Sequence, residues 1–287
     1  MNNIGVIINN KSKNHSEAGT YLEGFNDAKI PYTHYETTPK KLTATIKKCI
    51  KEHKIILIGG GDGTIRTAAQ YCAHTPIILG VLPLGTLNHF AKEMNLPGNV
   101  NELITSLKKK QTITIDLAKV NEHIFINNSS IGFYPKFADK RNQYSKHYNK
   151  WLSYIPGFIE SLKKHKTFTI TIKGKDLDIS LRTSFLMVSN NVYSYEFPVT
   201  IKRDSFQKAL LGLYYFKQGR IRIFKIIKSL FSNKNLFKIN QSNYPIEIHF
   251  NNEKEVTISL DGDTTKVKTP LHYKILPRSL IILTNPS

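Results

Sequence analysis

The sequence predicts a chain in two parts: an α/β domain built on a parallel sheet, followed by a β-rich sandwich domain. Up to about residue 110, short apolar runs alternate with helix-like segments, which is typical of a parallel α/β sheet. From residue 167 onward the segments are mostly short strands, as in an antiparallel sandwich. Glycine-rich loops follow two of the strands in the first part, where such sheets bind ligands.

The elements of the first part are predicted from apolar runs and from residues that start helices. Thr38 and Pro39 mark one helix start, with Thr38 as the N-cap and Pro39 as the first helical residue. We expect strands at 4–8, 32–37, 54–58 and 76–82, and helices at 16–28, 39–53, 65–70, 89–94 and 100–109. The loops after the strands would gather at one edge of the sheet.

The second part is predicted as strands with two helices. Strands are expected at 112–120, 123–133, 167–172, 177–181, 184–188, 211–216, 246–250, 255–260, 272–276 and 280–283, and helices at 148–164 and 219–232. We place the first domain at 1–120, with 277–287 as a candidate to rejoin it, and the second at 121–276. A ligand cleft between two adjoining domains is the usual arrangement.

The composition points to an anionic partner. Among 287 residues, Lys and Arg number 41 and Asp and Glu 21, which gives a formal charge of +20. Nucleic acid, an anionic membrane surface and a phosphorylated substrate fit this excess, and so does a merely basic surface. The two cysteines, Cys49 and Cys72, lack metal-ligand spacing, which fits a reducing cytosol. The sequence has no apolar run of membrane-spanning length, and residues 1–6 lack the layout of a signal peptide.

The first loop of chemical interest is Gly59-Gly60-Gly61-Asp62-Gly63-Thr64, between a buried strand and a helix. Glycine lets backbone N–H groups approach a phosphate, and the helix N-terminus adds a positive dipole. The loop is neither a Walker A loop nor a dinucleotide fingerprint, because its spacing differs from both. Asp62 would repel a phosphate unless it holds a metal, orients a hydroxyl or takes a proton. A structural turn with a capping Asp is the plainer interpretation.

Two further motifs support a functional interpretation. Pro83-Leu84-Gly85-Thr86-Leu87-Asn88 also joins a strand to a helix, and Thr86 and Asn88 can present a hydroxyl and an amide to a nucleotide. Far along the chain, Leu260-Asp261-Gly262-Asp263 places two acids around a glycine. That segment is either a hairpin turn or a site of metal-assisted proton transfer.

Together with the segment Phe125-Ile126-Asn127-Asn128-Ser129-Ser130-Ile131-Gly132-Phe133, these motifs resemble the diacylglycerol kinase catalytic-domain family. Its bacterial members are lipid kinases related to sphingosine and ceramide kinases, and the motifs span nearly the whole chain in the same order. The resemblance implies an α/β nucleotide-binding domain of the NAD kinase and diacylglycerol kinase type and a β-sandwich lipid-substrate domain. It also implies transfer of the ATP γ-phosphate, with Mg²⁺, to diacylglycerol or a similar single-hydroxyl lipid.

The resemblance assigns residues as well. It places the nucleotide at Asn9, Thr38, Gly59, Gly60, Gly61, Asp62, Gly63, Thr64, Ile65, Thr86 and Asn88. The family's catalytic acid ends an Asp-Gly-Glu motif and falls at Asp263, one methylene shorter here. Asp62 would then orient the metal and phosphates, or share the role of base with Asp261.

Some positions depart from the family pattern. Lys13 stands where the first loop usually ends in Gly. The family's metal loop falls at Ser205, Lys208 and Leu210, and Lys208 replaces its acid although an ammonium cannot ligate a cation. Either that metal site is empty, or Lys208 supplies its own charge, or Asp204 reaches in.

Two basic amphipathic segments, 136–162 and 220–231, are candidates for contact with a membrane, with packing on the β domain as the alternative. We therefore expect a cytoplasmic protein that binds its lipid peripherally at an anionic membrane. Nucleic acid is not an expected partner, because no recognition module occurs. A homodimer is one candidate assembly. An NAD kinase, which shares a Gly-Gly-Asp-Gly-Thr loop, and a lipid- or nucleotide-binding protein with little catalysis are the alternative functions.

Overall fold

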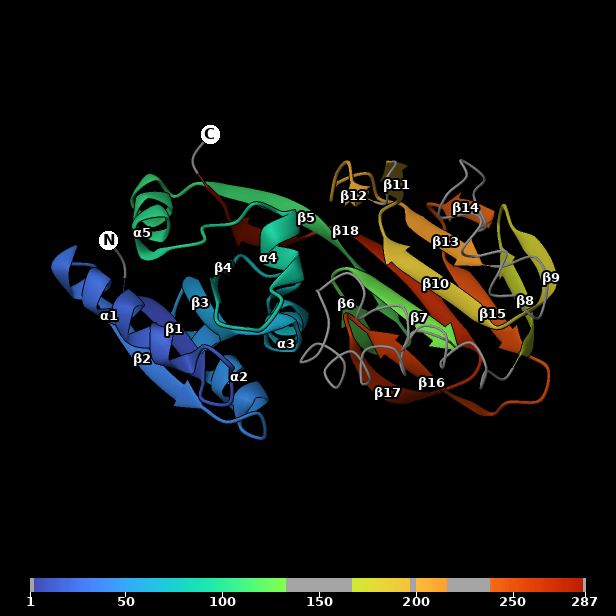
Figure 1. The fold of residues 1–287 in the computed structure, drawn as a ribbon, viewed down its shortest axis with the longest axis horizontal. Helices are drawn as coiled ribbons and strands as arrows, with labels where there is room; N and C mark the ends of the chain where they lie inside the picture. The colour runs from blue at the N-terminus through green and yellow to red at the C-terminus, as the bar shows by residue number, and fades with distance from the viewer. Residues whose placement is uncertain (1–2, 133–166, 197–199, 216–237, 286–287) are drawn as a thin grey trace, which may run out of the picture. The chain divides into compact units, whose positions relative to one another are not determined.

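The computed structural model describes residues 3–132, 167–196, 200–215 and 238–285 (Figure 1). The chain divides into two compact units, which we call unit 1 (Met1–Leu117 with Leu276–Ser287) and unit 2 (Ala118–Ile275). The helices predicted at 148–164 and 219–232, and with them both basic segments, lie outside the described residues. In the part of the chain that is described, no helix is long and apolar enough to cross a membrane.

Unit 1 is built on a parallel sheet. Its strand order is β2 (Tyr32–Thr37), β1 (Ile4–Asn9), β3 (Ile55–Gly60) and β4 (Ile78–Pro83), with the last part of β18 (Leu271–Leu283) parallel to β4. Every residue of β1 and β3 is buried. Burial on both faces explains why these strands are continuous apolar runs in the sequence rather than alternating ones.

Helices cover the sheet of unit 1. The helices α1 (Ala18–Asp27) and α5 (Val100–Lys109) share a core cluster with β1 and β3, in which Phe25 is fully buried. The helices α2 (Leu42–Glu52) and α3 (Asp62–Cys72) contact each other, and they contact β1 and β3 respectively. Two short pieces, η1 (His15–Glu17) and α4 (His89–Glu93), lie in loops that follow strands.

The strand–helix alternation predicted for the first part is confirmed, but the start predicted for α2 is wrong. Residues 38–41 first form a turn, in which the backbone N–H of Lys41 donates to the Thr38 carbonyl at 3.0 Å, and the helix begins at Leu42. Thr37, not Thr38, contacts the helix: its hydroxyl lies 3.0 Å from that of Thr45. The N-cap position is Lys41, whose side chain makes no capping bond.

Unit 2 is a β-rich sandwich. One sheet is antiparallel, in the order β14 (Lys238–Ser242), β13 (Leu211–Tyr215), β10 (Phe185–Asn190), β7 (Asn128–Gly132), β16 (Glu255–Leu260) and β17 (Asp263–Lys268). In the other, the first part of β18 pairs with β15 (Ile246–Phe250), followed by β8 (Phe168–Gly174) and β9 (Asp178–Thr183). The strand β5 (Thr112–Val120) pairs with β6 (His123–Phe125), and β11 (Tyr193–Glu196) pairs with β12 (Thr200–Arg203).

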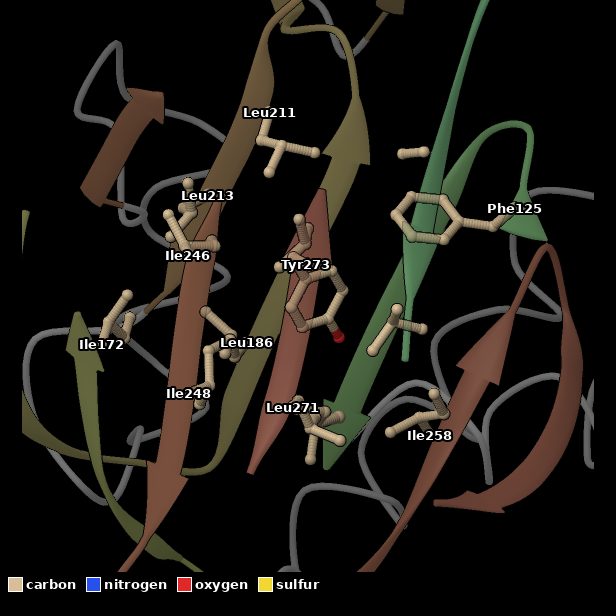
Figure 2. Packing of buried hydrophobic residues seen from close by; sticks show 14 of the residues in the cluster. Phe125, Ile172, Leu186, Leu211, Leu213, Ile246, Ile248, Ile258, Leu271 and Tyr273 are labelled. Carbon is tan, nitrogen blue, oxygen red and sulfur yellow. The ribbon is translucent and has the colours of Figure 1, made fainter. Parts of the chain in front are cut away.

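The core of unit 2 lies between these sheets. One buried cluster contains Ile131 and Ile258 from the antiparallel sheet together with Ile172, Ile248 and Tyr273 from the other (Figure 2). The Tyr273 side chain is fully buried, and its hydroxyl lies 2.9 Å from that of Ser129. Burial raises the pKa of the Tyr273 phenol, so this group stays neutral and acts only as a hydrogen-bond partner.

Two details of unit 2 differ from the prediction for physical reasons. The strand expected at 123–133 is broken into β6 and β7, because the backbone N–H groups of Ile126 and Asn127 bond a carboxylate instead of a strand. The strands expected at 272–276 and 280–283 are one strand, because the N–H of Arg278 is satisfied by Asp116 Oδ1 at 2.8 Å. The strands β11, β12, β14 and β17 were not predicted.

The Ser129–Tyr273 pair gives a test of this core. We expect Tyr273→Phe to lower the free energy of unfolding by about 1–2 kcal/mol, because it leaves the buried Ser129 hydroxyl without a partner. Adding Ser129→Ala to that variant should restore part of the loss. Chemical denaturation of both single variants and the double variant measures the coupling. Strictly additive effects would contradict the pairing.

Candidate functional site

Four loops meet at one edge of unit 1, because β1 to β4 run parallel and each loop follows the end of a strand. Hydrogen bonds fasten these loops to one another. The amide of Asn9 donates to the hydroxyl of Thr64 at 3.0 Å, and both side chains are buried. The N–H of Asn14 donates to the carbonyl of Leu84 at 3.1 Å. Residues predicted from separate motifs are thus brought together at this edge.

The two glycine loops touch backbone to backbone at Gly61 and Gly85. A Cβ added to Gly85 would lie 2.5 Å from the Gly61 Cα and 2.6 Å from the Asn88 Oδ1, closer than real contacts allow. A Cβ added to Gly61 would lie 3.5 Å from the Gly85 Cα, which is ordinary contact. Glycine is therefore required at position 85 by the close approach of the other loop.

Asp62 links the same loops through its carboxylate. It is the first residue of α3, yet its oxygens accept from the backbone N–H groups of His89 and Phe90, each at 3.2 Å. These N–H groups belong to the first turn of α4, where a carboxylate is favoured by the helix dipole and by the unpaired donors. Asp62 is thus a capping residue, as the plainer interpretation held, but it caps a second helix rather than its own. The carboxylate can still offer its remaining lone pairs to a ligand.

The Asn88 side chain bonds its own loop, whereas the sequence predicts that it binds a nucleotide. Its side-chain oxygen accepts from the Gly85 N–H at 2.9 Å, and its nitrogen donates to the carbonyls of Pro83 at 2.6 Å and Gly85 at 3.1 Å. The residue has a left-handed backbone, with φ of 50°, which Asn tolerates better than most residues. Its amide therefore folds the loop instead of pointing to a nucleotide. Thr86, in the same loop, is exposed, and its contact with a nucleotide stays a prediction.

The edge has the features of an anion site. The helix α3 begins at Asp62 directly after the glycines, and Gly61 has an extended backbone, with ψ of 178°. Four lysines on the adjoining loops are exposed: Lys11, Lys13, Lys40 and Lys41. A helix N-terminus, close-lying backbone and nearby ammonium groups together suit a polyphosphate. Lys13, which departs from the family pattern, adds to this positive charge.

The second acidic motif, in unit 2, is a hairpin turn. Asp261 and Gly262 join β16 to β17 with φ of 49° and 100°, as expected for a type I′ turn with an Asp-Gly sequence. The Asp261 carboxylate accepts three backbone N–H groups, from Ile126 at 2.8 Å, Asn127 at 2.7 Å and Asn128 at 3.0 Å. Asp263 begins β17 and is exposed. The two acids therefore differ: Asp261 holds a neighbouring segment, and Asp263 faces solvent.

Arg203 is a buried residue of this region that the sequence did not reveal. Its guanidinium donates to the Ile126 carbonyl at 3.3 Å and to the Tyr193 hydroxyl at 2.6 Å. It also lies over the ring of Phe206, 4.0 Å from its centroid. Arg203 and Asp261 thus fix segment 126–128 from its carbonyl and its N–H groups respectively. Arg203 ends β12, a strand that the sequence does not predict, so the sequence gives no signal of this role.

The loop expected to hold a metal carries an ion pair. The Lys208 ammonium lies 3.2 Å from an Asp204 carboxylate oxygen, and both side chains are about half exposed. The Ser205 hydroxyl accepts from the N–H of Gln207, and the N–H of Leu210 donates to Asn191. The ion pair does not distinguish between an empty metal site, a charge supplied by Lys208 and a ligand supplied by Asp204, so these stay alternative predictions. Among the described residues, this loop included, no group of three His, Cys, Asp or Glu side chains is arranged to hold a metal.

Comparison with known proteins agrees with this geometry. Residues 3–120 match the model of the diacylglycerol kinase catalytic domain. Through these residues the chain is similar to the diacylglycerol kinase catalytic-domain family. The match covers both glycine loops and ends with β5, so the motifs at 125–133 and 260–263 lie outside it.

Relatives and solved structures extend the likeness beyond residue 120. A candidate lipid kinase of Staphylococcus haemolyticus, SH2167, is 25% identical over 240 residues, which cover 81% of this chain and 77% of that protein. One of Staphylococcus aureus, SAB0675c, is 24% identical over 246 residues, covering 83% and 79%. A diacylglycerol kinase structure from Bacillus anthracis has a TM-score of 0.71 at 19% identity, covering 99% of this chain and 97% of that one. A second B. anthracis structure, of a candidate diacylglycerol kinase, reaches 0.77 at 22% identity, covering 99% and 98%. The structures share the fold.

The contact between Gly61 and Gly85 can be tested directly, because a Cβ atom has room at position 61 but not at position 85. We expect Gly85→Ala to destabilise unit 1 by about 1–3 kcal/mol, because its Cβ would collide with the Gly61 backbone. The matched variant Gly61→Ala should fold with little loss, because its Cβ has room. Thermal or chemical denaturation measures both. Equal losses in the two variants would contradict the contact.

Proposed function

We propose that this protein is an ATP-dependent lipid kinase that transfers the γ-phosphate to the hydroxyl of diacylglycerol or a closely related lipid. The observation that carries the proposal is the pairing of two glycine loops around one acid in a domain of the diacylglycerol kinase catalytic-domain family. The names of the relatives, which are candidate lipid kinases, support a lipid as acceptor.

The residues present fit the phosphates of a nucleotide. Gly59 and Gly60 are buried at the end of β3, whereas Gly61 is half-buried, and the N-terminus of α3 follows it at once. The exposed lysines of the adjoining loops supply counter-charge, and the exposed hydroxyl of Thr86 is a further donor. Catalysis of phosphoryl transfer depends mainly on such positioning and charge stabilisation.

The donor set also fits Mg²⁺ bound together with a nucleotide. Mg²⁺ is usually held by one or two carboxylates and by the phosphates of the substrate, not by an all-protein cage. Asp62 is the carboxylate at the glycine loops, and its two bonds to α4 fix its orientation. When bound, the metal would neutralise charge on the phosphoryl oxygens. Asp62 is thus proposed as a metal-orienting residue rather than as the base.

Asp263 is the proposed general base. The lipid hydroxyl oxygen forms a bond to the γ-phosphorus as the bond from that phosphorus to the β–γ bridging oxygen breaks, and the hydroxyl proton passes to a carboxylate. Asp261 is engaged by three backbone N–H groups, and Asp263 is exposed at the start of β17. The phosphoryl transfer would take place in the cytoplasm at an anionic membrane, where the acceptor lipid is found.

A screen with radiolabelled ATP tests the proposal. Purified full-length protein is incubated with vesicles of diacylglycerol, ceramide, sphingosine or monoacylglycerol, and separately with NAD, with and without Mg²⁺. We expect label in a lipid product, in diacylglycerol above all, and only with Mg²⁺. Label in NAD would favour the NAD kinase alternative. ATP or vesicle binding without any labelled product would favour a binding protein.

The two acids of the hairpin give a second test. We expect Asp263→Ala to reduce kcat by about 100-fold or more, as for loss of a general base, with little change in stability. Asp261→Ala should instead lower the free energy of unfolding by about 1–3 kcal/mol, because three N–H groups lose their acceptor. Denaturation curves and initial rates separate the two effects. Near-normal turnover in Asp263→Ala would place the base elsewhere.

A further inference from the structure

The helix α2 exposes a row of lysines. Its buried residues share one stripe of the helix, with spacings of four and three: Leu42, Ile46 and Cys49. The residues on the opposite side of the helix are all exposed: Ala44, Lys47, Lys48 and Lys51. Exposed lysines also stand directly before and shortly after the helix. We call the six of them together the lysine row: Lys40, Lys41, Lys47, Lys48, Lys51 and Lys54.

The helix α2 lies on the face of the parallel sheet that α1 and α5 do not cover. Ile4, Val6 and Ile8 of β1 pack in one cluster with residues of α1 and α5. Gly5 stands between them in the strand, and a Cβ there would collide with the Cys49 side chain of α2. Because successive residues of a strand face opposite sides of a sheet, α2 occupies the layer opposite to α1 and α5.

The two layers differ in charge. In η1, α1, α5 and the two residues after each, exposed acids and exposed lysines are equal in number: Glu17, Glu23, Asp27 and Glu102 against Lys29, Lys108, Lys109 and Lys110. In the stretch 38–76, which holds α2 and α3, the acids are Glu52 and Asp62. Each is already bonded, Glu52 to the Tyr35 hydroxyl at 2.5 Å and Asp62 to the backbone of α4. The α2 layer therefore carries a large excess of positive charge.

The stability of α2 does not account for the lysine row. Lys51 lies in the last turn, where the helix dipole favours a cation, but Lys41 stands at the opposite end, where the dipole disfavours one. Lys47 and Lys51 form an i, i+4 pair of like charge, which destabilises a helix. In the part of the chain that is described, no ion pair joins a lysine of the row to an acid.

The lysine row suits an extended anionic surface. The 11 residues of α2 span about 16 Å, which is longer than a single phosphate group. The exposed residues of α2 include no aromatic, arginine or amide side chain, the groups with which proteins stack on bases or read them. They include no large apolar side chain to insert into a bilayer either. Contact would therefore be electrostatic, at the level of anionic headgroups.

We infer that the lysine row binds the anionic phospholipid headgroups of the membrane that contains the acceptor lipid. The ammonium groups attract the phosphates of the bilayer surface within about a Debye length, ~10 Å at moderate salt. The inference rests on the proposed lipid kinase function for its choice of a membrane, and it names the surface of unit 1 that meets that membrane. The row begins in the loop after β2, at the edge where the four loops meet, so the bilayer would lie beside the candidate site.

Vesicle sedimentation with the full chain tests the inference. The vesicles contain phosphatidylcholine, with or without phosphatidylglycerol. We expect the triple variant Lys47→Gln, Lys48→Gln, Lys51→Gln to partition onto the anionic vesicles about 10- to 100-fold less than the wild type at low salt. High salt should weaken the binding of the wild type more than that of the variant, because salt screens exposed charges. Binding by the variant that equals wild-type binding would overturn the inference.

A matched control removes the same charge from the other layer. The triple variant Lys108→Gln, Lys109→Gln, Lys110→Gln should bind anionic vesicles within about threefold of the wild type, because its lysines face away from the proposed membrane surface. Both triple variants should keep a Tm close to that of the wild type, since all the changed side chains are exposed. Equal loss of binding in both would mean that only net charge acts, and would overturn the lysine row as a surface.

A second variant separates charge from packing. Lys47 lies over the Tyr71 ring, 5.1 Å from its centroid, and Lys48 lies over the Tyr35 ring at 5.6 Å. Arginine keeps both the charge and the contact with a ring, so Lys47→Arg, Lys48→Arg, Lys51→Arg should bind as the wild type does. Loss of binding in this variant would contradict a role of charge. Tighter wild-type binding to an oligonucleotide than to anionic vesicles, lost in the glutamine variant, would assign the row to nucleic acid instead.

Kinase assays distinguish this inference from the proposed function. With a short-chain diacylglycerol in non-ionic micelles, the glutamine variant of α2 should turn over at the wild-type rate. With the same lipid in anionic vesicles, its rate should fall together with its binding. Unchanged rates in anionic vesicles would overturn the inference and leave the kinase proposal standing. A wild-type protein that binds anionic vesicles through the row but phosphorylates no lipid would remove the kinase proposal and leave the binding surface.

Discussion

The close approach of the Gly61 and Gly85 backbones is the contact on which the candidate site depends. Only a residue without a side chain fits at position 85, and the contact brings the ends of β3 and β4 together at the edge of the sheet. Asp62 strengthens the same junction by binding the first N–H groups of α4. Two loops that could each be ordinary turns are thereby joined by a backbone contact and by a carboxylate whose orientation is set by two hydrogen bonds. That junction is what a polyphosphate requires.

Two aspartates of this chain, Asp62 and Asp261, hold distant backbone segments in place. Asp62 binds N–H groups 27 and 28 residues away, and Asp261 binds N–H groups 133 to 135 residues away. In both cases the carboxylate satisfies donors that neither a helix nor a strand can satisfy. Each acid thereby fixes a segment from another motif. The oxygens of both carboxylates are already engaged as acceptors by these N–H groups. Asp263, at the start of β17, is exposed.

The fold was predictable from the sequence where local pattern determines structure. Continuous apolar runs identified β1 and β3, and the glycine motifs identified the loops after β3 and β4. The predictions fail where the local structure depends on a contact with a residue far along the chain. Thr38 has the composition of an N-cap, yet a turn delays the helix to Leu42. The break between β6 and β7 follows from Asp261, far along the chain, and the burial of Arg203 depends on packing against Tyr193 and Phe206. No local signal encodes these contacts, and the inward turn of the Asn88 amide is equally invisible in a motif.

Hydrogen–deuterium exchange across the full chain, with and without Mg²⁺ and a non-hydrolysable ATP analogue, tests the central claim most directly. If the joined glycine loops hold the nucleotide phosphates, the analogue should slow exchange in peptides that contain Asn9 to Asn14, Gly59 to Ile65 and Pro83 to Phe90. The Gly85→Ala variant should lose this protection. Binding of the analogue with unchanged exchange in those three segments, and protection elsewhere, would contradict the account.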